Sequence, residues 1–182
     1  VTNLDDDQAA VLISAVDNVS EEANAGNTAS YQVVLSTAPS NTVNIGVAVD
    51  SQGTLSSLAT LSFGVGDWNV PQNVVIIADD DAVDEGSHST VITLTPSGAD
   101  ATYAALPPLL IEASVLDDDT AGVSLTAVSG LVTNEIGLTD SYDIVLTSQP
   151  TASVTINVSS SDVSQISITG SPVVFGTGDW NV

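Results

Sequence analysis

The sequence predicts an all-β protein: a seven-stranded antiparallel β-sandwich of Greek-key-like, immunoglobulin-like type, in tandem repeats of 112 residues. Apolar and polar residues alternate with a period of two over many short segments, and no amphipathic helix of useful length is visible. The motif FGVGDWNV at 63–70 returns as FGTGDWNV at 175–182. Three aspartates at 5–7 return at 117–119 with the same offset. Two markers that share one period indicate copies of one domain.

Seven strands are expected in the first complete copy, separated by turns rich in Gly, Pro, Ser and Asn. They cover residues 10–16, 30–36, 43–49, 58–63, 73–78, 90–95 and 109–116. This number and spacing of short strands is typical of a β-sandwich. The start of the series repeats at 123–128, 142–147, 154–160 and 166–175.

The repeat predicts three domain segments. Residues 1–7 are expected to end a preceding repeat, and residues 8–119 to form a complete sandwich. Residues 120–182 are expected to hold the first four strands of the next repeat. That half-sandwich is either part of a longer chain or completed by strands of a neighbouring chain in a fibre.

The composition combines high charge with high hydrophobicity. The chain of 182 residues has 23 Asp and Glu, no Lys or Arg and no Cys, so its net charge is −23. Its hydrophobic fraction of 43% argues for a packed core rather than intrinsic disorder. Without cationic side chains the chain lacks a surface for nucleic acid or anionic lipid. No apolar run is long enough to span a membrane, so no direct membrane insertion is expected.

The acidic residues are expected to gather at one end of the sandwich. If successive strands alternate in direction, the first, third and fifth connections lie at that end, where the seventh strand also finishes. The expected cluster comprises Glu21, Glu22, Asp50, Asp79, Asp80, Asp81, Glu85, Asp117, Asp118 and Asp119. Neighbouring carboxylates repel one another by roughly 1 kcal/mol per pair even at the dielectric constant of water.

A bound cation is the favoured means of neutralising this cluster, because the chain has no cationic side chain of its own except a single His. Carboxylates on loops suit Ca²⁺, which takes about 6–8 oxygen ligands. Zinc or copper would prefer His or Cys. The alternative is a solvated acidic end that keeps the protein soluble. The sequence therefore predicts Ca²⁺ as the cofactor.

These residues resemble a known family. The segment IADDD at 77–81 followed by Glu85-Gly86, the closing aspartates at 117–119, and the segment VSEE at 19–22 are similar to the Calx-beta domain. The resemblance covers residues 8–119 and the first half of the second copy. It implies a seven-stranded sandwich with calcium among Glu21 or Glu22, Asp50, Asp79–Asp81, Glu85 and Asp117–Asp119. The chain departs from many members at His88 and Ser89, where they carry a second acidic residue.

The resulting functional hypothesis is a calcium-binding structural repeat. Adjacent repeats of the same chain, stiffened by calcium at their junctions, would form the stalk or fibre of an extracellular, bacterial surface or adhesion protein. The alternative is a binding module that recognises a carbohydrate or protein partner through its loops or a sheet face. No enzymatic activity is expected, because His88 is the only candidate base and the acids lie on loops. The number of repeats, the number of ions and the adhesive target stay open.

Two aromatic loops and the histidine have competing interpretations. Trp68 and Trp180 occupy equivalent loops and either close the bottom of the sandwich or stack on a sugar. His88 either lies at an ordinary strand edge or contacts a metal.

Overall fold

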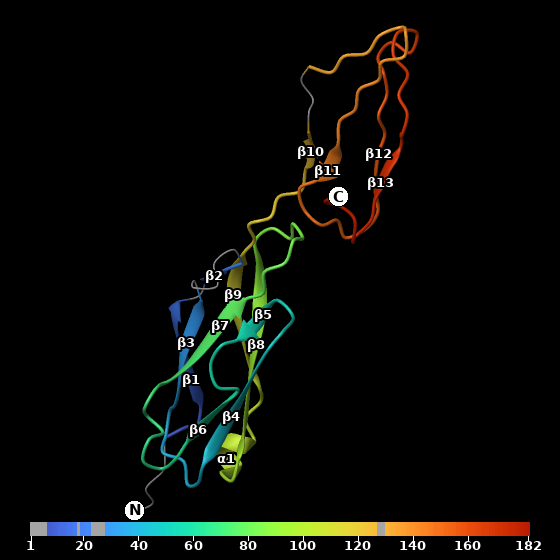
Figure 1. Cartoon of the computed structure of the whole chain (residues 1–182). Coiled ribbons are helices and arrows are strands. Elements are labelled where there is room, and N and C mark those ends of the chain that lie inside the picture. Colours follow the sequence, from blue (N-terminus) through green and yellow to red (C-terminus); the bar gives the residue numbers. More distant parts are fainter. Residues whose placement is uncertain (1–6, 18, 23–27, 127–129) are drawn as a thin grey trace, which may run out of the picture. The chain divides into compact units, whose positions relative to one another are not determined.

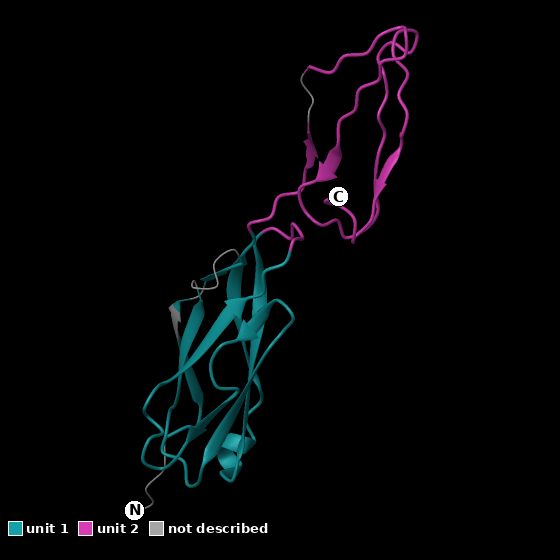
Figure 2. Ribbon diagram, in the orientation of Figure 1, with its two compact units in different colours: residues 1–81, 87–117 teal, residues 82–86, 118–182 magenta. Residues whose placement is uncertain are grey.

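The computed structural model describes residues 7–17, 19–22, 28–126 and 130–182. The chain divides into two compact units: unit 1 comprises residues 1–81 and 87–117, and unit 2 comprises residues 82–86 and 118–182 (Figure 2). The regular elements are strands in both units, apart from one helical turn, which confirms the predicted all-β class. Unit 1 ends two residues before the predicted boundary at 119, and residues 1–6 of the expected preceding repeat lie outside the described part. None of the described helices is long and apolar enough to cross a membrane.

Unit 1 is a sandwich of two sheets (Figure 1). One sheet has the order β1-β3-β7-β5, and the other has the order β2-β9-β8-β4-β6. The strands are β1 Val11–Asp17, β2 Val19–Glu21, β3 Ala29–Leu35, β4 Val43–Val49, β5 Gly53–Leu55, β6 Thr60–Phe63, β7 Gln72–Ala78, β8 His88–Gly98 and β9 Leu109–Leu116.

The observed sandwich differs from the expected one in three ways. β1 matches the first expected strand, but a further strand, β2, lies where a loop carrying Glu21 was expected; it belongs to the other sheet and runs parallel to β9, so the unit is not wholly antiparallel. The short strand β5 was not expected, because three residues are too few to show an alternation. A helical turn, α1 (Ala101–Ala104), stands in the connection before β9. Asp100 caps it by accepting hydrogen bonds from the backbone N–H groups of Thr102 and Tyr103.

The core of unit 1 follows from the alternation of side chains along each strand, because successive residues point to opposite faces. In β3 every second residue is buried, from Ala29 to Leu35. The buried set consists mainly of aliphatic residues with a few aromatics: Val11, Ala29, Tyr31, Val33, Leu35, Val43, Ile45, Val47, Leu61, Phe63, Val74, Ile76, Ile92, Leu94, Tyr103 and Ala113.

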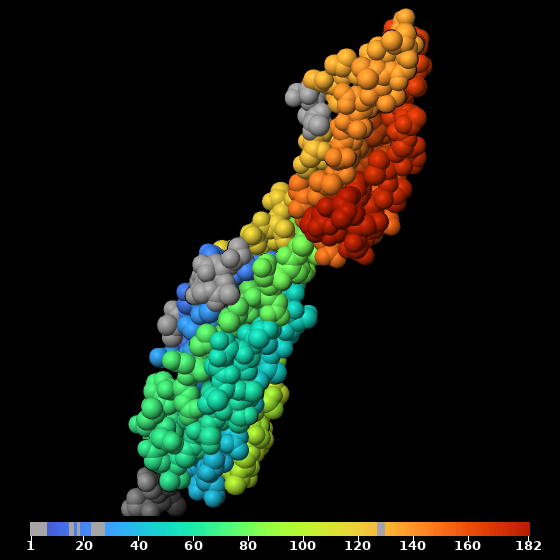
Figure 3. Space-filling model, viewed as in Figure 1, coloured from blue at the N-terminus to red at the C-terminus, as the bar shows by residue number. Residues whose placement is uncertain are grey.

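Unit 2 contains two separate pairs of strands. Its residues from 118 onward are coloured yellow to red in the space-filling view of Figure 3. The first sheet pairs β10 (Val123–Leu125) with β11 (Ile144–Leu146), and the second pairs β12 (Val154–Ile156) with β13 (Val173–Phe175). The strands lie within the expected ranges but are shorter. Only two large apolar side chains of the described part of this unit are buried, Leu146 and Phe175.

The two units use the same local strand pairing at the offset seen in the sequence. The corresponding pairs are Val11–Leu35 with Val123–Leu146, and Val43–Phe63 with Val154–Phe175. The aromatic loops also correspond. The backbone N–H of Leu35 donates to the carbonyl of Trp68 over 3.0 Å, and that of Leu146 donates to the carbonyl of Trp180 over 2.9 Å.

Candidate functional site

Two features of the structure are candidates for function: the acidic end of unit 1 and the open apolar side of unit 2. At the acidic end, the parallel pairing of β2 with β9 places Glu21 opposite Leu116. The next residues along these parallel strands, Glu22 and Asp117, are therefore neighbours. Their carboxylate oxygens lie within 4.8 Å of one another.

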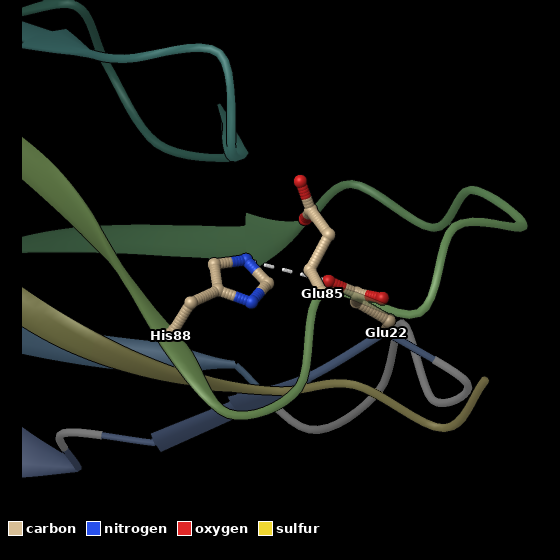
Figure 4. A group of neighbouring side chains, drawn as sticks. All are labelled: Glu22, Glu85 and His88. Carbon is tan, nitrogen blue, oxygen red and sulfur yellow. Dashed lines mark ion pairs between the residues drawn. The ribbon is translucent and has the colours of Figure 1, made fainter. Parts of the chain in front are cut away.

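Glu22 is the buried member of this cluster, with 4% of its surface exposed. Its Oε1 lies 3.5 Å from Nε2 of His88, the first residue of β8 (Figure 4). Glu85, also drawn in Figure 4, belongs to segment 82–86, which clusters with unit 2. Burying a carboxylate is costly unless it is paired, so His88 is the partner that the strand arrangement supplies when its ring is protonated. The interpretation of His88 as an ordinary strand-edge residue did not include its contact with Glu22.

Asp50 closes β4 and uses its carboxylate to tie that strand to β8. Oδ1 accepts hydrogen bonds from Thr90 Oγ1 over 2.7 Å and from the Gln52 N–H over 3.1 Å, and Oδ2 accepts one from the Val91 N–H over 2.8 Å. Partial burial acts to raise the pKa of Asp50, but the hydrogen bonds from Thr90, Val91 and Gln52, with the nearby His88, hold it below its ordinary value. The geometry therefore gives Asp50 a structural role.

The remaining expected metal ligands lie in different surroundings. Glu21 is half-buried within β2, and Asp79 accepts a hydrogen bond from Thr54 Oγ1 over 2.7 Å. Asp80 and Asp81 are exposed. Glu85, Asp118 and Asp119 belong to residues that cluster with unit 2. Within unit 1 the structure thus brings Glu22 and Asp117 closest together.

The expected Ca²⁺ stays a prediction. The carboxylate oxygens of Glu22 and Asp117 are ligands of the kind that Ca²⁺ takes, whereas the imidazole nitrogen of His88 suits a softer metal. If calcium binds, it stabilises the folded chain by about 2.7 kcal/mol at 100 times its dissociation constant. We expect millimolar Ca²⁺, but not Mg²⁺, to raise the melting temperature relative to excess chelator, and Glu22→Gln to abolish the increase.

The exposed carboxylate of Glu135 provides the matched control for that melt, since Glu135→Gln removes a charge from unit 2 without touching the cluster. A melting temperature that is equal in calcium and in chelator would exclude the ion and leave the acids as a solvated end. An equal loss of the increase in both variants would show a non-specific charge effect.

The second candidate site is the open side of unit 2, where most residues equivalent to the core of unit 1, other than Leu146 and Phe175, are not buried. Val11 is 6% exposed, whereas its counterpart Val123 is 49% exposed. In six further pairs the residue of unit 1 is buried and its counterpart in unit 2 is half-buried. These pairs are Tyr31 and Tyr142, Val33 and Ile144, Val43 and Val154, Ile45 and Ile156, Val47 and Val158, and Leu61 and Val173. Side chains at equivalent strand positions are therefore more exposed in unit 2 than in unit 1.

A groove of about 640 Å³ opens within unit 2, and its lining includes apolar residues of both strand pairs. Ile144 of β11 and Val173 of β13 contribute to it, with Tyr142 just before β11 and Val158 just after β12. Asp140 and Asp143 also line it. Each sheet here has two strands, so β11 and β12 carry no strand on their second edge among the described residues. In unit 1 the matching edges of β3 and β4 are occupied by β7 and β8.

The sequence interpretation did not name these groove residues as functional. The signal that could have found them is the repeat itself, which aligns Ile144 and Val158 with core positions of the first copy. The expected segment 120–182 contains no counterpart of β7, β8 or β9 to cover them.

Both aromatic loops are anchored to their own units. Trp68 is half-buried against the core of unit 1, and Asp67 Oδ1 accepts a hydrogen bond from the Gly64 N–H over 2.5 Å. Asp179 accepts the equivalent bond from Gly176 in unit 2. The positions of Trp68 and Trp180, both half-buried, suit the interpretation that they close the sandwich better than sugar stacking, which needs an exposed ring.

Comparison with known proteins gives only distant likenesses. No protein-family model matches the chain, and no curated protein matches it. Among solved structures, the periplasmic chaperone SfaE has a TM-score of 0.42 and 9% identity, over 60% of this chain and 57% of that one. The Salmonella enterica SafA pilin in complex with the SafB chaperone has a TM-score of 0.40 and 12% identity, over 72% and 60%.

A third structure is the CsuC–CsuE chaperone–tip adhesion subunit pre-assembly complex of Acinetobacter baumannii, with a TM-score of 0.39 and 6% identity over 82% of this chain and 81% of that one. The chain spans about three fifths of the length of the first two structures. The likeness concerns the fold alone.

These findings correct the main functional prediction. The similar structures are chaperones and chaperone–subunit complexes rather than calcium-binding stalk repeats, so the prediction of a calcium-stiffened stalk built from adjacent repeats of the same chain is wrong. The alternative prediction, a module that binds a partner, is the one carried forward.

Proposed function

We propose that this chain is a binding module that recognises a protein partner through the open groove of unit 2. One observation carries the proposal: apolar residues buried in unit 1 have counterparts in unit 2 that are only half-buried, and the groove residue Ile144, the counterpart of the fully buried Val33, is one of them. Covering apolar surface contributes about 25 cal/mol per Å². Exposed apolar surface that is contiguous, and rimmed here by carboxylates, is typical of an interaction site.

A protein partner fits this groove better than a carbohydrate. The groove has aliphatic side chains in its lining, and β11 and β12 of the same unit each carry a strand on one edge only among the described residues. Peptides commonly bind such edges, because main-chain hydrogen bonds supply affinity and side-chain pockets supply specificity. Sugars are held by exposed aromatic faces, whereas both tryptophans of this chain are half-buried.

The experiment that tests the proposal is selection of random displayed peptides on the full chain. We expect recovery of extended peptides with apolar residues at alternate positions, and we expect Ile144→Asp to weaken their binding at least tenfold, because it places a charge in the groove. Binding would be measured by fluorescence anisotropy of the recovered peptides.

Val163→Asp is the matched control, because Val163 is 83% exposed and does not line the groove. Its affinity should equal that of the unchanged chain. The proposal fails if no peptide is enriched, if Ile144→Asp binds equally well, or if the chain instead binds an oligosaccharide array.

The repeat relation between the two units is a further part of the proposal. We propose that the two units are copies of one Greek-key-like repeat, which the matching strand registers support. Membership of the Calx-beta family rests on the sequence resemblance described above. An extracellular or bacterial surface location and the lack of enzymatic activity stay predictions.

A further inference from the structure

One end of the five-stranded sheet of unit 1 holds a histidine beside a buried carboxylate. In that sheet β9 lies between β2 and β8. His88, the first residue of β8, pairs with Val115 of β9, and the backbone N–H of Glu22 donates to the carbonyl of Leu116 over 3.1 Å. Because neighbouring residues of one strand hold both backbones, the register of β9 with β2 and β8 sets how far apart Glu22 and His88 lie.

Both side chains are largely withdrawn from solvent. The side chain of Glu22 is 3% exposed and that of His88 is 17% exposed. Ser20, two residues before Glu22, and Thr90, two residues after His88, are fully buried. Alternate residues of a strand share one face, so Glu22 and His88 continue the inward-facing rows of β2 and β8 to the end of the sandwich. Side chains that are already ordered in this way lose little freedom when they bind a ligand.

The separation of the two side chains suits a shared metal ion. Oε1 of Glu22 lies 3.5 Å from Nε2 of His88 (Figure 4). A charge-assisted hydrogen bond between these atoms would be about 2.7–2.9 Å long. Two ligand atoms at about 2.0–2.1 Å from a tetrahedral Zn²⁺ are about 3.4 Å apart. The observed spacing therefore matches two ligands of one zinc ion better than a direct hydrogen bond.

The chemistry of the donors decides between zinc and calcium. An imidazole nitrogen is a preferred ligand of Zn²⁺, whereas Ca²⁺ takes oxygen ligands. His88 is the only histidine, and the chain has no Cys, so this is the one place in the sequence where a nitrogen or sulfur side-chain ligand of zinc is found. A further carboxylate is near, because an oxygen of Asp117 lies within 4.8 Å of one of Glu22.

We propose that unit 1 binds Zn²⁺ through Glu22 and His88, with Asp117 as the third ligand and water in the remaining position. This site is separate from the groove of unit 2 and does not depend on the function proposed for it. It also differs from the predicted calcium site, which uses carboxylate oxygens alone. Both ions would require Glu22, so they would compete for it.

A zinc titration of the full chain, followed by NMR, tests the proposal directly, because the imidazole signals of a single histidine are unambiguous. At pH 7.5 we expect Zn²⁺ to shift the ring signals of His88 and to saturate at a single ion. Mg²⁺ at the same concentration should leave them unchanged. Ring signals that do not respond to Zn²⁺ would overturn the proposal.

Two variants then assign the ligands by calorimetry. His88→Asn and Glu22→Gln should each weaken Zn²⁺ binding at least tenfold. Glu135→Gln, which removes an exposed carboxylate of unit 2, is the matched control and should bind Zn²⁺ as tightly as the unchanged chain. Equal affinity in all of these variants would assign the ion to surface carboxylates and would also overturn the proposal. If a variant does not fold, the NMR titration of the unchanged chain decides.

Discussion

Replacement of Ile45 by alanine should lower the free energy of unfolding of unit 1 by about 2–5 kcal/mol. Ile45 is fully buried in β4 and belongs to the central core cluster. The smaller side chain loses the transfer free energy of the removed methyl and methylene groups and leaves a cavity that the surrounding sheets fill only in part. Urea denaturation, followed by fluorescence of Trp68 in a Trp180→Phe background, measures the loss.

Ile156→Ala provides the matched control, because Ile156 is the counterpart of Ile45 in unit 2 and is only half-buried. With no partner bound, this substitution should cost less than about 1 kcal/mol, since it removes few packing contacts. If both variants lost the same free energy of unfolding, Ile156 would be as well covered in solution as Ile45. The groove of unit 2 would then not be open to a partner.

Gly98→Ala should destabilise unit 1 by about 2–4 kcal/mol. Gly98 ends β8 opposite Val43 with a φ of +119°, a backbone conformation that side chains other than glycine rarely adopt. A Cβ atom here would also lie 2.5 Å from the carbonyl oxygen of Thr42. That carbonyl accepts a hydrogen bond from Ala99 over 3.2 Å, so the β4–β8 pairing would have to shift at its end.

Gly66→Ala is the control for this substitution. An added Cβ at Gly66 meets no atom within 4 Å, and its φ is not positive. Its effect on the free energy of unfolding should lie within about 0.5 kcal/mol of zero. A Gly98→Ala variant as stable as Gly66→Ala in the same urea titration would contradict the strained geometry at the end of β8.

Much of the strand arrangement could be predicted from local patterns. β3, β4, β7, β8 and β9 lie close to the expected ranges, because alternation of apolar and polar residues over six or more positions is a strong signal. β5 and α1 were not predicted, since each is too short to show a period. β2 was also missed, because three residues show no period and its place in the second sheet depends on its pairing with β9.

The acidic end was predicted in part. The connection between the first two expected strands, which carries Glu21 and Glu22, was expected to meet the end of the seventh strand, and Glu22 and Asp117 do lie together there. Asp50 was expected among the ligands, but its oxygens bond Thr90 and Val91. Such hydrogen bonds depend on the register between β4 and β8, which sequence patterns do not specify.

By itself, the sequence determined which side chains share a face and which segments are repeated. Alternation sets the face because a strand turns successive residues to opposite sides, and the repeat predicts matching positions such as Ile45 and Ile156. Only the tertiary structure decided whether each face is covered. β4, which carries Ile45, pairs with β8, a strand that begins more than 40 residues later, whereas β12, which carries Ile156, pairs only with β13 among the described residues. Burial is decided by pairing between distant segments, and local sequence carries no record of that pairing.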